Sequence, residues 1–391
     1  MKVLIVGAGI GGLTAALAAL KRGFDVEVYE QAAELREVGA GLQLSANGTR
    51  VFYELGVGEA LRAHSCEAAG KEIRLWNTGE TWKLFDLGKV SVERYGYPYF
   101  TVYRPDLLEV LLAAIGRDRI HLGAKCVGLT QTADRVRLEF ENHPPVTGDA
   151  LIGADGVHSQ VRQTLFGQDQ PQFTGIVVWR GIVPMDKLPK HMARMVGSNW
   201  VGPGAHVVHY PLRAGKVMNF VGALERSDWQ VESWSARGTT EELAADFAGW
   251  HEDVQALIRN IPAPYKWALM TRPPMERWSA GRVTLLGDAC HSMVPFLAQG
   301  AVMAIEDGFV LGRCLQKYAD AEVALARYED ARRERTRKAV EGSSANIARF
   351  HHPALAEPAK ARDYVAREWA GQNVAERYEW LFRYDAATAP I

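Results

Sequence analysis

The sequence has few cysteines, and no pattern links them. Cys66, Cys126, Cys290 and Cys314 are the only four in 391 residues, and they form no C-x-x-C pair. A disulfide-stapled scaffold and a thiol redox motif are therefore excluded. Scattered cysteines suit free thiols in a reducing cytoplasm, where we expect the protein to lie, and we predict no metal site. Cys290 is expected to pack as a small buried residue.

An excess of charge of either sign is also lacking. The chain carries 45 basic and 46 acidic side chains, for a formal net charge of −1. This balance gives no electrostatic basis for binding nucleic acid or an anionic membrane. The sequence contains no repeat, low-complexity tract or long linker. With 48% hydrophobic and 23% charged residues, it predicts a folded protein of about two domains.

The long uncharged run at 3–20 has the composition of neither a membrane span nor a signal peptide. It contains four glycines and no plausible cleavage site. A strand-like segment, Asp25-Val-Glu-Val-Tyr-Glu30, follows it closely. Both membrane readings are therefore disfavoured.

Residues 2–30 instead predict a strand, a glycine turn, a helix and a second strand. Gly7 permits the tight turn, Gly9 lets the backbone approach a pyrophosphate, and Gly12 allows close packing of helix on strand; Gly11 lies between them. The helix N-terminus offers N–H groups and a positive dipole end to phosphates. Glu30 ends the second strand, where it can accept from ribose hydroxyls. The segment therefore predicts dinucleotide binding.

A second strand-to-helix transition lies late in the chain. A buried strand from Val283 stops at Gly287 and Asp288, and a loop containing Pro295 leads to a helix starting near Gly300. A carboxylate after a strand and a free helix N-terminus both face the crevice where open α/β sheets bind ligands. Alone, this pattern is also an ordinary turn.

The identity of the dinucleotide is only narrowed by these motifs. An acid at Glu30 disfavours a 2′-phosphate, so the nucleotide is either NAD or the AMP half of FAD. The glycines cannot separate the two. The rest of the chain has to decide between them.

Pattern changes along the chain predict an α/β fold in which separated segments form a Rossmann-like domain with a parallel sheet. An inserted, mostly antiparallel β domain and C-terminal helices complete it. The predicted FAD-binding domain comprises 1–70, 104–174 and 271–330, the substrate-binding β domain 71–103 and 175–270, and the C-terminal helical segment 331–391. Strands are expected near 120–122, 135–141, 176–182 and 206–212, and helices over 104–115 and beyond 322.

Three motifs together resemble one known family. They are Gly7 to Gly12 with Glu30, Gly153-Ala-Asp155-Gly156 with Ser159 and Arg162, and Gly287-Asp288 with Pro295 and Gly300. In this order and spacing the chain resembles the flavin-dependent aromatic hydroxylases, the single-component FAD monooxygenases related to 4-hydroxybenzoate, salicylate and 3-hydroxybenzoate hydroxylases. The similarity runs along the whole chain, including a Tyr-Arg-Pro-Asp-Leu box at Arg104.

The resemblance implies a set of cofactor contacts. Glu30 and Gln31 would hold the adenosine ribose, the Val127 backbone would meet the adenine side, Gln43 and Arg104 would line the flavin, and Asp288 would bind the ribityl chain. Beside Pro295, residues Gln299, Gly300, Ala301 and Val302 would cover the pyrimidine edge of the isoalloxazine. A helix N-terminus at Gly300 would independently stabilise the anionic reduced flavin.

The resemblance also implies the reaction. NADH or NADPH would dock transiently near Asp155 and Arg162, although turn and packing roles for these two residues are equally open. With O2, the reduced FAD would hydroxylate a small phenolic aromatic acid such as salicylate or 3-hydroxybenzoate through a flavin hydroperoxide. A 6-hydroxynicotinate or other hydroxypyridine hydroxylase is the alternative, but Gln43 stands where those enzymes would place a histidine. A non-catalytic flavin-binding protein and an NAD-dependent dehydrogenase are the other classes, and a homodimer is one expected assembly.

Ring hydroxylation needs a base for the phenolic proton, and the strand at 206–212 supplies candidates. His206, Val208 and Tyr210 share one face because strand side chains alternate. Four residues of strand span about 13 Å, so His206 and Tyr210 would flank a bound ring rather than contact each other. Histidine is the expected base and tyrosine the group that orients substrate, as at the matching positions of resembling hydroxybenzoate hydroxylases. Arg180 and Arg213 are further candidates for holding a carboxylate, with surface or packing roles expected first.

Overall fold

A six-stranded sheet brings together three distant segments of the chain. Its spatial order is β18 (Ser279–Ala280), β19 (Val283–Leu285), β12 (Ala150–Gly153), β1 (Lys2–Val6), β2 (Asp25–Glu30) and β8 (Ile120–Leu122). All pairs are parallel except β18 with β19. This computed structural model describes residues 1–35, 40–229, 236–369 and 371–391. The predicted Rossmann-like parallel sheet is confirmed.

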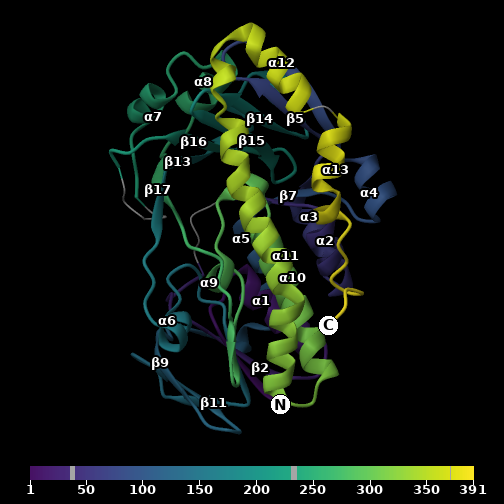
Figure 1. Cartoon of the computed structure of the whole chain (residues 1–391), viewed down its shortest axis with the longest axis vertical. Helices are drawn as coiled ribbons and strands as arrows, with labels where there is room; N and C mark the ends of the chain where they lie inside the picture. The colour runs from purple at the N-terminus through teal and green to yellow at the C-terminus, as the bar shows by residue number, and fades with distance from the viewer. Residues whose placement is uncertain (36–39, 230–235, 370) are drawn as a thin grey trace.

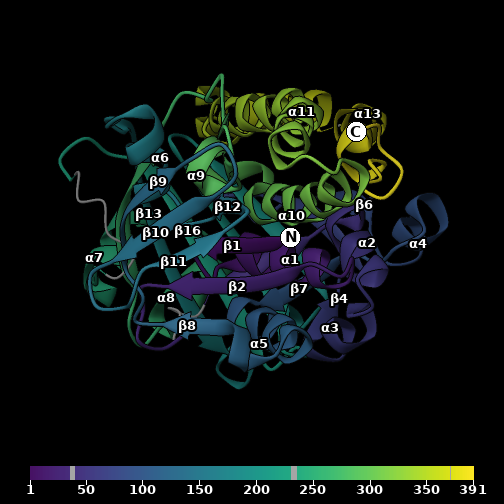
Figure 2. The ribbon, with the colours of Figure 1, turned by 90° about the horizontal axis from the view of Figure 1, so that it is seen from below.

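Helices and a small second sheet cover this parallel sheet, which is why its strands are rich in Val, Ile and Leu. The helix α1 (Ile10–Leu20) packs against α5 (Arg104–Ile115) and α10 (Gly300–Lys317). The meander of β9 (Cys126–Gln131), β10 (Val136–Phe140) and β11 (Val146–Gly148) contacts β1, and α6 (Gln160–Phe166) packs on β9. Figure 2 shows β1 and β2 side by side between α10 and α5.

The close approach of α1 and α10 depends on glycine. A Cβ on Gly308 would lie 2.6 Å from the backbone nitrogen of Ala15. A Cβ on Gly312 would lie 3.0 Å from the Ala18 side chain. Any larger residue at Gly308 would separate the two helices, whose N-termini both face the nucleotide-binding edge of the sheet.

The second half of the molecule is a seven-stranded sheet. Its order is β17 (Tyr265–Thr271), β13 (Gln172–Pro184), β16 (Val217–Glu225), β15 (Ala205–Leu212), β14 (Val196–Gly202), β5 (Gly70–Leu75) and β6 (Thr81–Asp86). Only the pair β5 and β14 is parallel, so the predicted mostly antiparallel sheet is confirmed. The cluster of buried residues on one face includes Leu243 of α7 (Thr240–Asp246) and Val254 of α8 (Glu252–Arg259).

A three-stranded sheet joins the two halves. It consists of β3 (Gly41–Leu44), β7 (Phe100–Tyr103) and β4 (Ser65–Glu67), with α2 (Ala46–Glu54), α3 (Gly58–His64) and α4 (Lys89–Tyr95) nearby. The predicted segment 71–103 is therefore divided. Strands β5 and β6 join the seven-stranded sheet, whereas β7 pairs with β3 and β4.

The C-terminal part is helical, as expected, but it does not begin at 331. That predicted boundary lies inside α11 (Ala321–Phe350), a continuous helix that runs past both halves of the molecule (Figure 1). After it follow α12 (Pro358–Glu368) and α13 (Gly371–Phe382). The remaining short helices are α9 (Asp288–His291) and the 3-10 turns η1 (Arg117–Arg119), η2 (Met185–Lys187), η3 (Lys190–Met192), η4 (Pro295–Leu297) and η5 (Pro353–Ala356). No helix within the described ranges is long and apolar enough to cross a membrane.

A buried ionic cluster fastens α10 to α11. Asp307 accepts from Arg332 Nε at 2.8 Å, and Glu306 lies 2.8 Å from the Arg332 guanidinium and 2.7 Å from Arg335. Burial alone would raise the pKa of Asp307, but His291 and Arg332 outweigh it and the pKa is lowered. Asp307 also accepts the Gly287 N–H at 3.1 Å. The cluster therefore fixes the Gly-Asp turn as well as the two helices.

Removing Arg332 should strongly destabilise the fold. Arg332→Met leaves buried carboxylates short of a partner and should lower the free energy of unfolding by about 3–5 kcal/mol. Arg337→Met is the matched control on the same helix, because Arg337 pairs with Glu334 at the surface and its loss should leave the free energy of unfolding nearly unchanged. Guanidinium chloride unfolding measures both. Equal effects would show that the buried cluster does not hold the helices together.

Candidate active site

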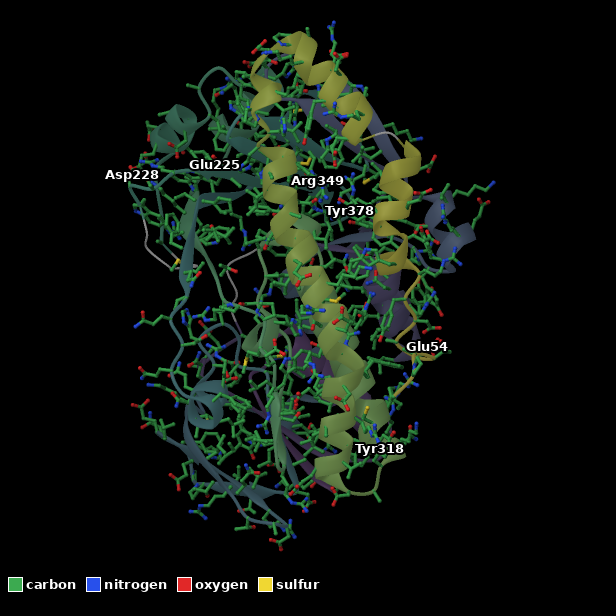
Figure 3. The ribbon with its side chains drawn as sticks, viewed as in Figure 1. Glu54, Glu225, Asp228, Tyr318, Arg349 and Tyr378 are labelled. Carbon is green, nitrogen blue, oxygen red and sulfur yellow. The ribbon has the colours of Figure 1, made fainter. Side chains whose placement is uncertain are left out.

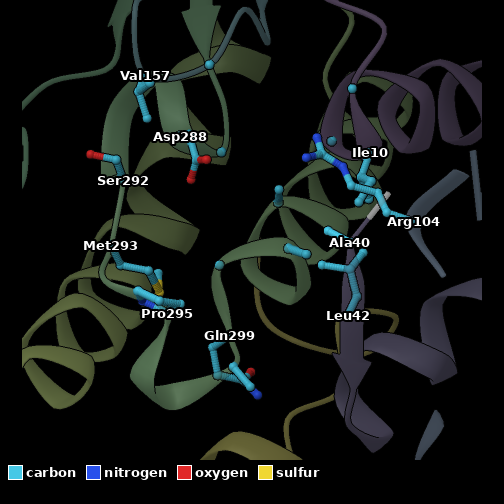
Figure 4. Close-up of a pocket in the computed structure, with 18 of the residues that line it drawn as sticks. Ile10, Ala40, Leu42, Arg104, Val157, Asp288, Ser292, Met293, Pro295 and Gln299 are labelled. Atoms are coloured by element: carbon cyan, nitrogen blue, oxygen red, sulfur yellow. The ribbon is translucent and has the colours of Figure 1, made fainter. Parts of the chain in front are cut away.

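A cavity of about 600 Å³ runs from the glycine turn after β1 to the face of the seven-stranded sheet. Its walls come from every part of the fold: the β1–α1 turn, the end of β2, β3, the loop 287–300, the seven-stranded sheet and the C-terminal helices. Its size falls within the range of small-molecule and cofactor sites. Figure 4 shows the loop residues Asp288 to Gln299 on one side and Ile10, Ala40, Leu42 and Arg104 on the other.

The glycines after β1 have the geometry that their spacing predicts. Gly7 has φ +105°, and a Cβ there would lie 2.3 Å from the carbonyl oxygen of Ala154. A Cβ on Gly12 would lie 2.0 Å from the Gly7 carbonyl oxygen, and one on Gly11 2.6 Å from the Leu286 side chain. A Cβ on Gly9 would meet no described atom within 4 Å, and Gly9 precedes α1 without a side-chain cap. The turn therefore offers open backbone to a ligand.

Glu30 lies at the end of β2 and shapes this turn. Its two carboxylate oxygens accept the N–H groups of Ala8 at 2.8 Å and Ala32 at 2.9 Å. Glu30 and Gln31 both line the cavity, at the end where an adenosine ribose is expected.

Val127 does not contribute its side chain to this end. Cys126 lines the cavity, whereas the next residue on β9 points outward and Val127 is 47% exposed. The alternation of strand side chains explains the difference. Ala124 and Cys126 are the wall residues here, and a contact of the Val127 backbone with adenine stays a prediction.

Asp288 and Arg104 lie on opposite walls in the middle of the cavity (Figure 4). Asp288 begins α9 directly after Gly287, which has φ +61°. The Asp288 side chain is exposed to the cavity, and the cavity itself is enclosed by the surrounding protein. Burial raises the pKa of Asp288, although His291, Arg104 and Arg272 pull in the other direction. A carboxylate so placed favours a ligand hydroxyl that can donate to it.

Asp155 also lines the cavity, but its oxygens are engaged within the protein. It accepts from the Ser159 hydroxyl at 2.5 Å and from the Val161 N–H at 3.1 Å, and burial raises its pKa. Arg162 is 3% exposed and donates to the Ala289 carbonyl at 2.9 Å. Of the roles left open for Arg162, these contacts support packing: it joins the Asp-Gly motif to α9.

The helix α10 presents its N-terminus to the cavity. Gly300 begins it with no side-chain cap, and Gly300, Ala301, Gln299 and Pro295 are wall residues. The Gln299 amide is held from behind, donating to the Ser45 hydroxyl at 3.0 Å and accepting from Asn47 at 3.2 Å. Uncapped N–H groups and the helix dipole suit an anionic or oxygen-rich edge.

Val302 is placed differently. It is fully buried, and its side chain would touch a Cβ on Gly48 at 3.1 Å. Only its backbone N–H, at the third position of α10, is left to serve a ligand. Gln43, by contrast, is a wall residue and accepts from the Tyr99 hydroxyl at 2.9 Å.

The seven-stranded sheet supplies the far end of the cavity. His206, Val208 and Tyr210 line it from one face of β15, while Val207 packs into the core on the other face. In register with Val208 are Asn199, Val221 and Arg180, all of them wall residues. Arg180 therefore faces the cavity, with its guanidinium 4.7 Å from the Trp267 ring. Arg213 pairs with Asp106 at 2.6 Å and is not among the wall residues.

Lys71 is a wall residue that sequence reasoning missed. It lies on β5 beside Gly197, where a Cβ would be 3.6 Å from Lys71 Cγ, 3.9 Å from Tyr210 Cβ and 4.0 Å from Gln43 Oε1. Burial lowers its pKa to about 8, and no described acid acts on it. The only sequence signal was a lysine within a strand, which is usually a solvent-exposed residue.

Comparison with known proteins agrees with this geometry. A family model described as an FAD binding domain matches residues 1–343. The chain belongs to this FAD-binding family. Its relatives include the 3-amino-4-hydroxybenzoate 2-monooxygenase of Streptomyces platensis, 38% identical over 99% of this chain and 96% of that protein. The 3-hydroxybenzoate 6-hydroxylase of Polaromonas naphthalenivorans is 36% identical, over 98% of this chain and 96% of that protein. The 6-hydroxynicotinate 3-monooxygenase of Pseudomonas fluorescens is 32% identical, over 100% of this chain and 96% of that protein.

A solved structure shows the same fold throughout. Klebsiella pneumoniae HpxO, in complex with FAD and uric acid, aligns with a TM-score of 0.86 at 29% identity, covering 100% of this chain and 97% of that one. The predicted membership of the single-component FAD aromatic hydroxylases and the predicted cofactor are thereby confirmed. The open turn at Gly9, the Asp288 carboxylate and the uncapped α10 fit the pyrophosphate, ribityl chain and flavin of FAD in turn.

Loss of the Asp288 carboxylate should weaken FAD binding. Asp288→Ala removes a charged hydrogen-bond acceptor and should raise the Kd for FAD at least about tenfold. Titration of the apoprotein with FAD, followed by flavin fluorescence, measures this. Asp86→Ala is the control, because Asp86 pairs with Lys83 at the surface of β6. An unchanged Kd in Asp288→Ala would remove Asp288 from the cofactor site.

Proposed function

We propose that this protein hydroxylates a small phenolic aromatic acid, with FAD as its cofactor, NADH or NADPH as reductant and O2 as oxidant. The family and its named relatives support the reaction class. The observation that carries the acid is Lys71, a half-buried ammonium on the cavity wall that lies 5.9 Å from the Tyr99 ring and has no described acid beside it. A partly desolvated cation without an acidic partner favours an anionic ligand.

The substrate end has complementary groups at its two sides. Lys71 and Tyr210 lie beside Gly197 on neighbouring strands, and His206 lies four residues from Tyr210 on the same strand face, about 13 Å away. Lys71 would bind the carboxylate, and Tyr210 would orient the ring through a substrate oxygen. His206 would take the phenolic proton, which activates the ring for attack. Arg180, on the same face, adds positive charge to this end.

FAD supplies the redox chemistry: it accepts a hydride from the nicotinamide and activates O2. The protein positions and shields it. Asp288 and the α10 N-terminus would hold the flavin, and Pro295 and Gln299 line the cavity beside them. The apolar walls formed by Val208, Val221 and others exclude water from the reacting ring.

Three further expectations stay predictions. NAD(P)H is expected to dock near Asp155, and the place of Asp155 on the cavity wall supports this. A cytoplasmic location is expected, and the four buried, free cysteines are compatible with it. A homodimer is expected, and light scattering of the purified protein would test it.

Replacing His206 should separate cofactor binding from hydroxylation. His206→Ala should still bind FAD, because His206 lies at the far end of the cavity, but should lose about 10²- to 10⁴-fold in hydroxylation. NADH and NADPH oxidation, with product analysis across hydroxybenzoates and hydroxypyridines, measures this. Unchanged turnover would remove His206 from the mechanism. Wild-type protein that is yellow yet inactive with every phenolic acid would favour a non-catalytic flavoprotein, and activity restricted to hydroxypyridines would favour the other substrate class.

The charge of Lys71 should be visible in the pH profile. The ammonium is present below its pKa of about 8 and is lost above it. Because kcat/KM reports the free enzyme, kcat/KM for a hydroxybenzoate should fall as the pH rises through about 8. Lys71→Met should raise KM for the acid at least about tenfold and change KM for the neutral hydroxybenzamide little. Lys83→Met, on the exposed part of β6, is the control. Equal effects on the acid and the amide would contradict a carboxylate contact.

A further inference from the structure

The cavity-lining His206 is hydrogen bonded to a second histidine that sequence reasoning did not single out. His206 Nδ1 lies 2.7 Å from His351 Nε2. His351 Nδ1 lies 3.1 Å from Glu225 Oε1. The three side chains come from β15, from the residue after α11 and from the end of β16, so only the tertiary fold brings them together.

These three groups connect the cavity with bulk solvent. His206 is 1% exposed and lines the cavity, and His351 is 5% exposed and does not. The Glu225 side chain is 56% exposed. Figure 3 shows Glu225 beside the upper part of α11. The line of hydrogen bonds thus begins at the substrate end and finishes at a carboxylate in water.

The bonds also have a direction. A carboxylate accepts, so His351 Nδ1–H donates to Glu225 and His351 Nε2 is left as an acceptor. His206 Nδ1–H must then donate to His351, which leaves His206 Nε2 as an acceptor toward the cavity. Burial, with the neighbouring His351 second, holds the pKa of His206 well below its usual range, and burial lowers the pKa of His351 despite Glu225. Both rings are therefore neutral at rest.

We propose that His206, His351 and Glu225 form a proton relay that carries the phenolic proton of the substrate from the buried site to solvent. The proposal rests on the function proposed above. The substrate O–H bond breaks and a proton joins His206 Nε2, while the Nδ1 proton of His206 passes to His351 Nε2. The Nδ1 proton of His351 passes to the Glu225 carboxylate, which releases it to water. No electrons move in this chain. The same bonds return a proton when the hydroxylated ring regains its phenolic hydroxyl, and both imidazoles recover their first tautomers.

The relay explains how a buried histidine can accept the substrate proton without becoming charged. A neutral, fully buried His206 could hold the substrate proton only as an isolated imidazolium, which burial strongly disfavours. Passing a proton outward as one is accepted leaves both rings neutral. In a purely structural role, His351 would pack against Phe296, 6.4 Å away between ring centres, and its loss would change stability rather than proton exchange.

A pH jump with a coloured phenol tests the relay without turnover. The FAD-bound enzyme is mixed with 3-hydroxy-4-nitrobenzoate, whose phenolate absorbs in the visible range, and is then shifted from acidic to neutral buffer. The colour change measures proton exchange between the bound phenol and solvent. It should be at least about tenfold slower in His351→Gln and Glu225→Gln than in the wild type. Glu225→Asp, which keeps a carboxylate, should recover part of the rate.

Control and folding checks come from the same region. His352→Asn should exchange at the wild-type rate, because His352 stacks on Tyr364 and caps η5 outside the relay. Glu225→Gln alters an exposed side chain and so tests the relay even where His351→Gln fails to fold. Exchange at the wild-type rate in Glu225→Gln, in a variant that binds the nitrophenol normally, would overturn the relay alone. Failure of the wild-type enzyme to bind or oxidise any phenolic acid would overturn the proposed function, and the relay with it.

Discussion

Two adjacent acids buried in α10, Glu306 and Asp307, form the interaction on which the site depends. They hold Arg332 of α11, and Asp307 also holds the Gly287 N–H and His291. The N-terminus of α10 and the Gly-Asp turn thereby keep a fixed separation, although only the short helix α9 and the turn η4 lie in the segment 288–299 between them. Because a buried charge without a partner is costly, the cluster disfavours arrangements that separate these elements.

The segment 288–299 separates the part of the cavity suited to the dinucleotide from the part suited to the substrate. On one side lie groups suited to a dinucleotide: an open glycine turn, Glu30 and Asp288. On the other lies a sheet face with a cation at one end and a histidine at the other. A flavin held between them would border both water-excluding walls, and the protons of the reaction would need a defined path out. From His206, hydrogen bonds lead through His351 to Glu225, whose side chain is exposed.

The accuracy of the sequence predictions varies with the range of the interactions they rest on. The predicted bounds of the helix at 104–115 and of the strand at 120–122 match those of α5 and β8. His206, Val208 and Tyr210 share one face of their strand, as the alternation of strand side chains requires. Of the strands within the predicted segment 71–103, β6 and most of β5 lie in the seven-stranded sheet, whereas β7 pairs with β3 and β4. Strand partners depend on packing that local periodicity does not encode. Lys71 was missed for the same reason. Its side chain lines the cavity because β5 pairs with β14, and the sequence does not reveal that pairing.

The sequence by itself determined the cofactor class, since the glycine turn, Glu30 and the two Asp-Gly-type motifs act through backbone conformation and nearby residues. The tertiary structure alone decided how the substrate end is charged and how its protons leave. Lys71 and Tyr210 reach Gly197 from two different strands, and His206 hydrogen bonds to His351 across 145 residues of chain. Neither arrangement leaves a local pattern, because each depends on which elements the folded core brings into register.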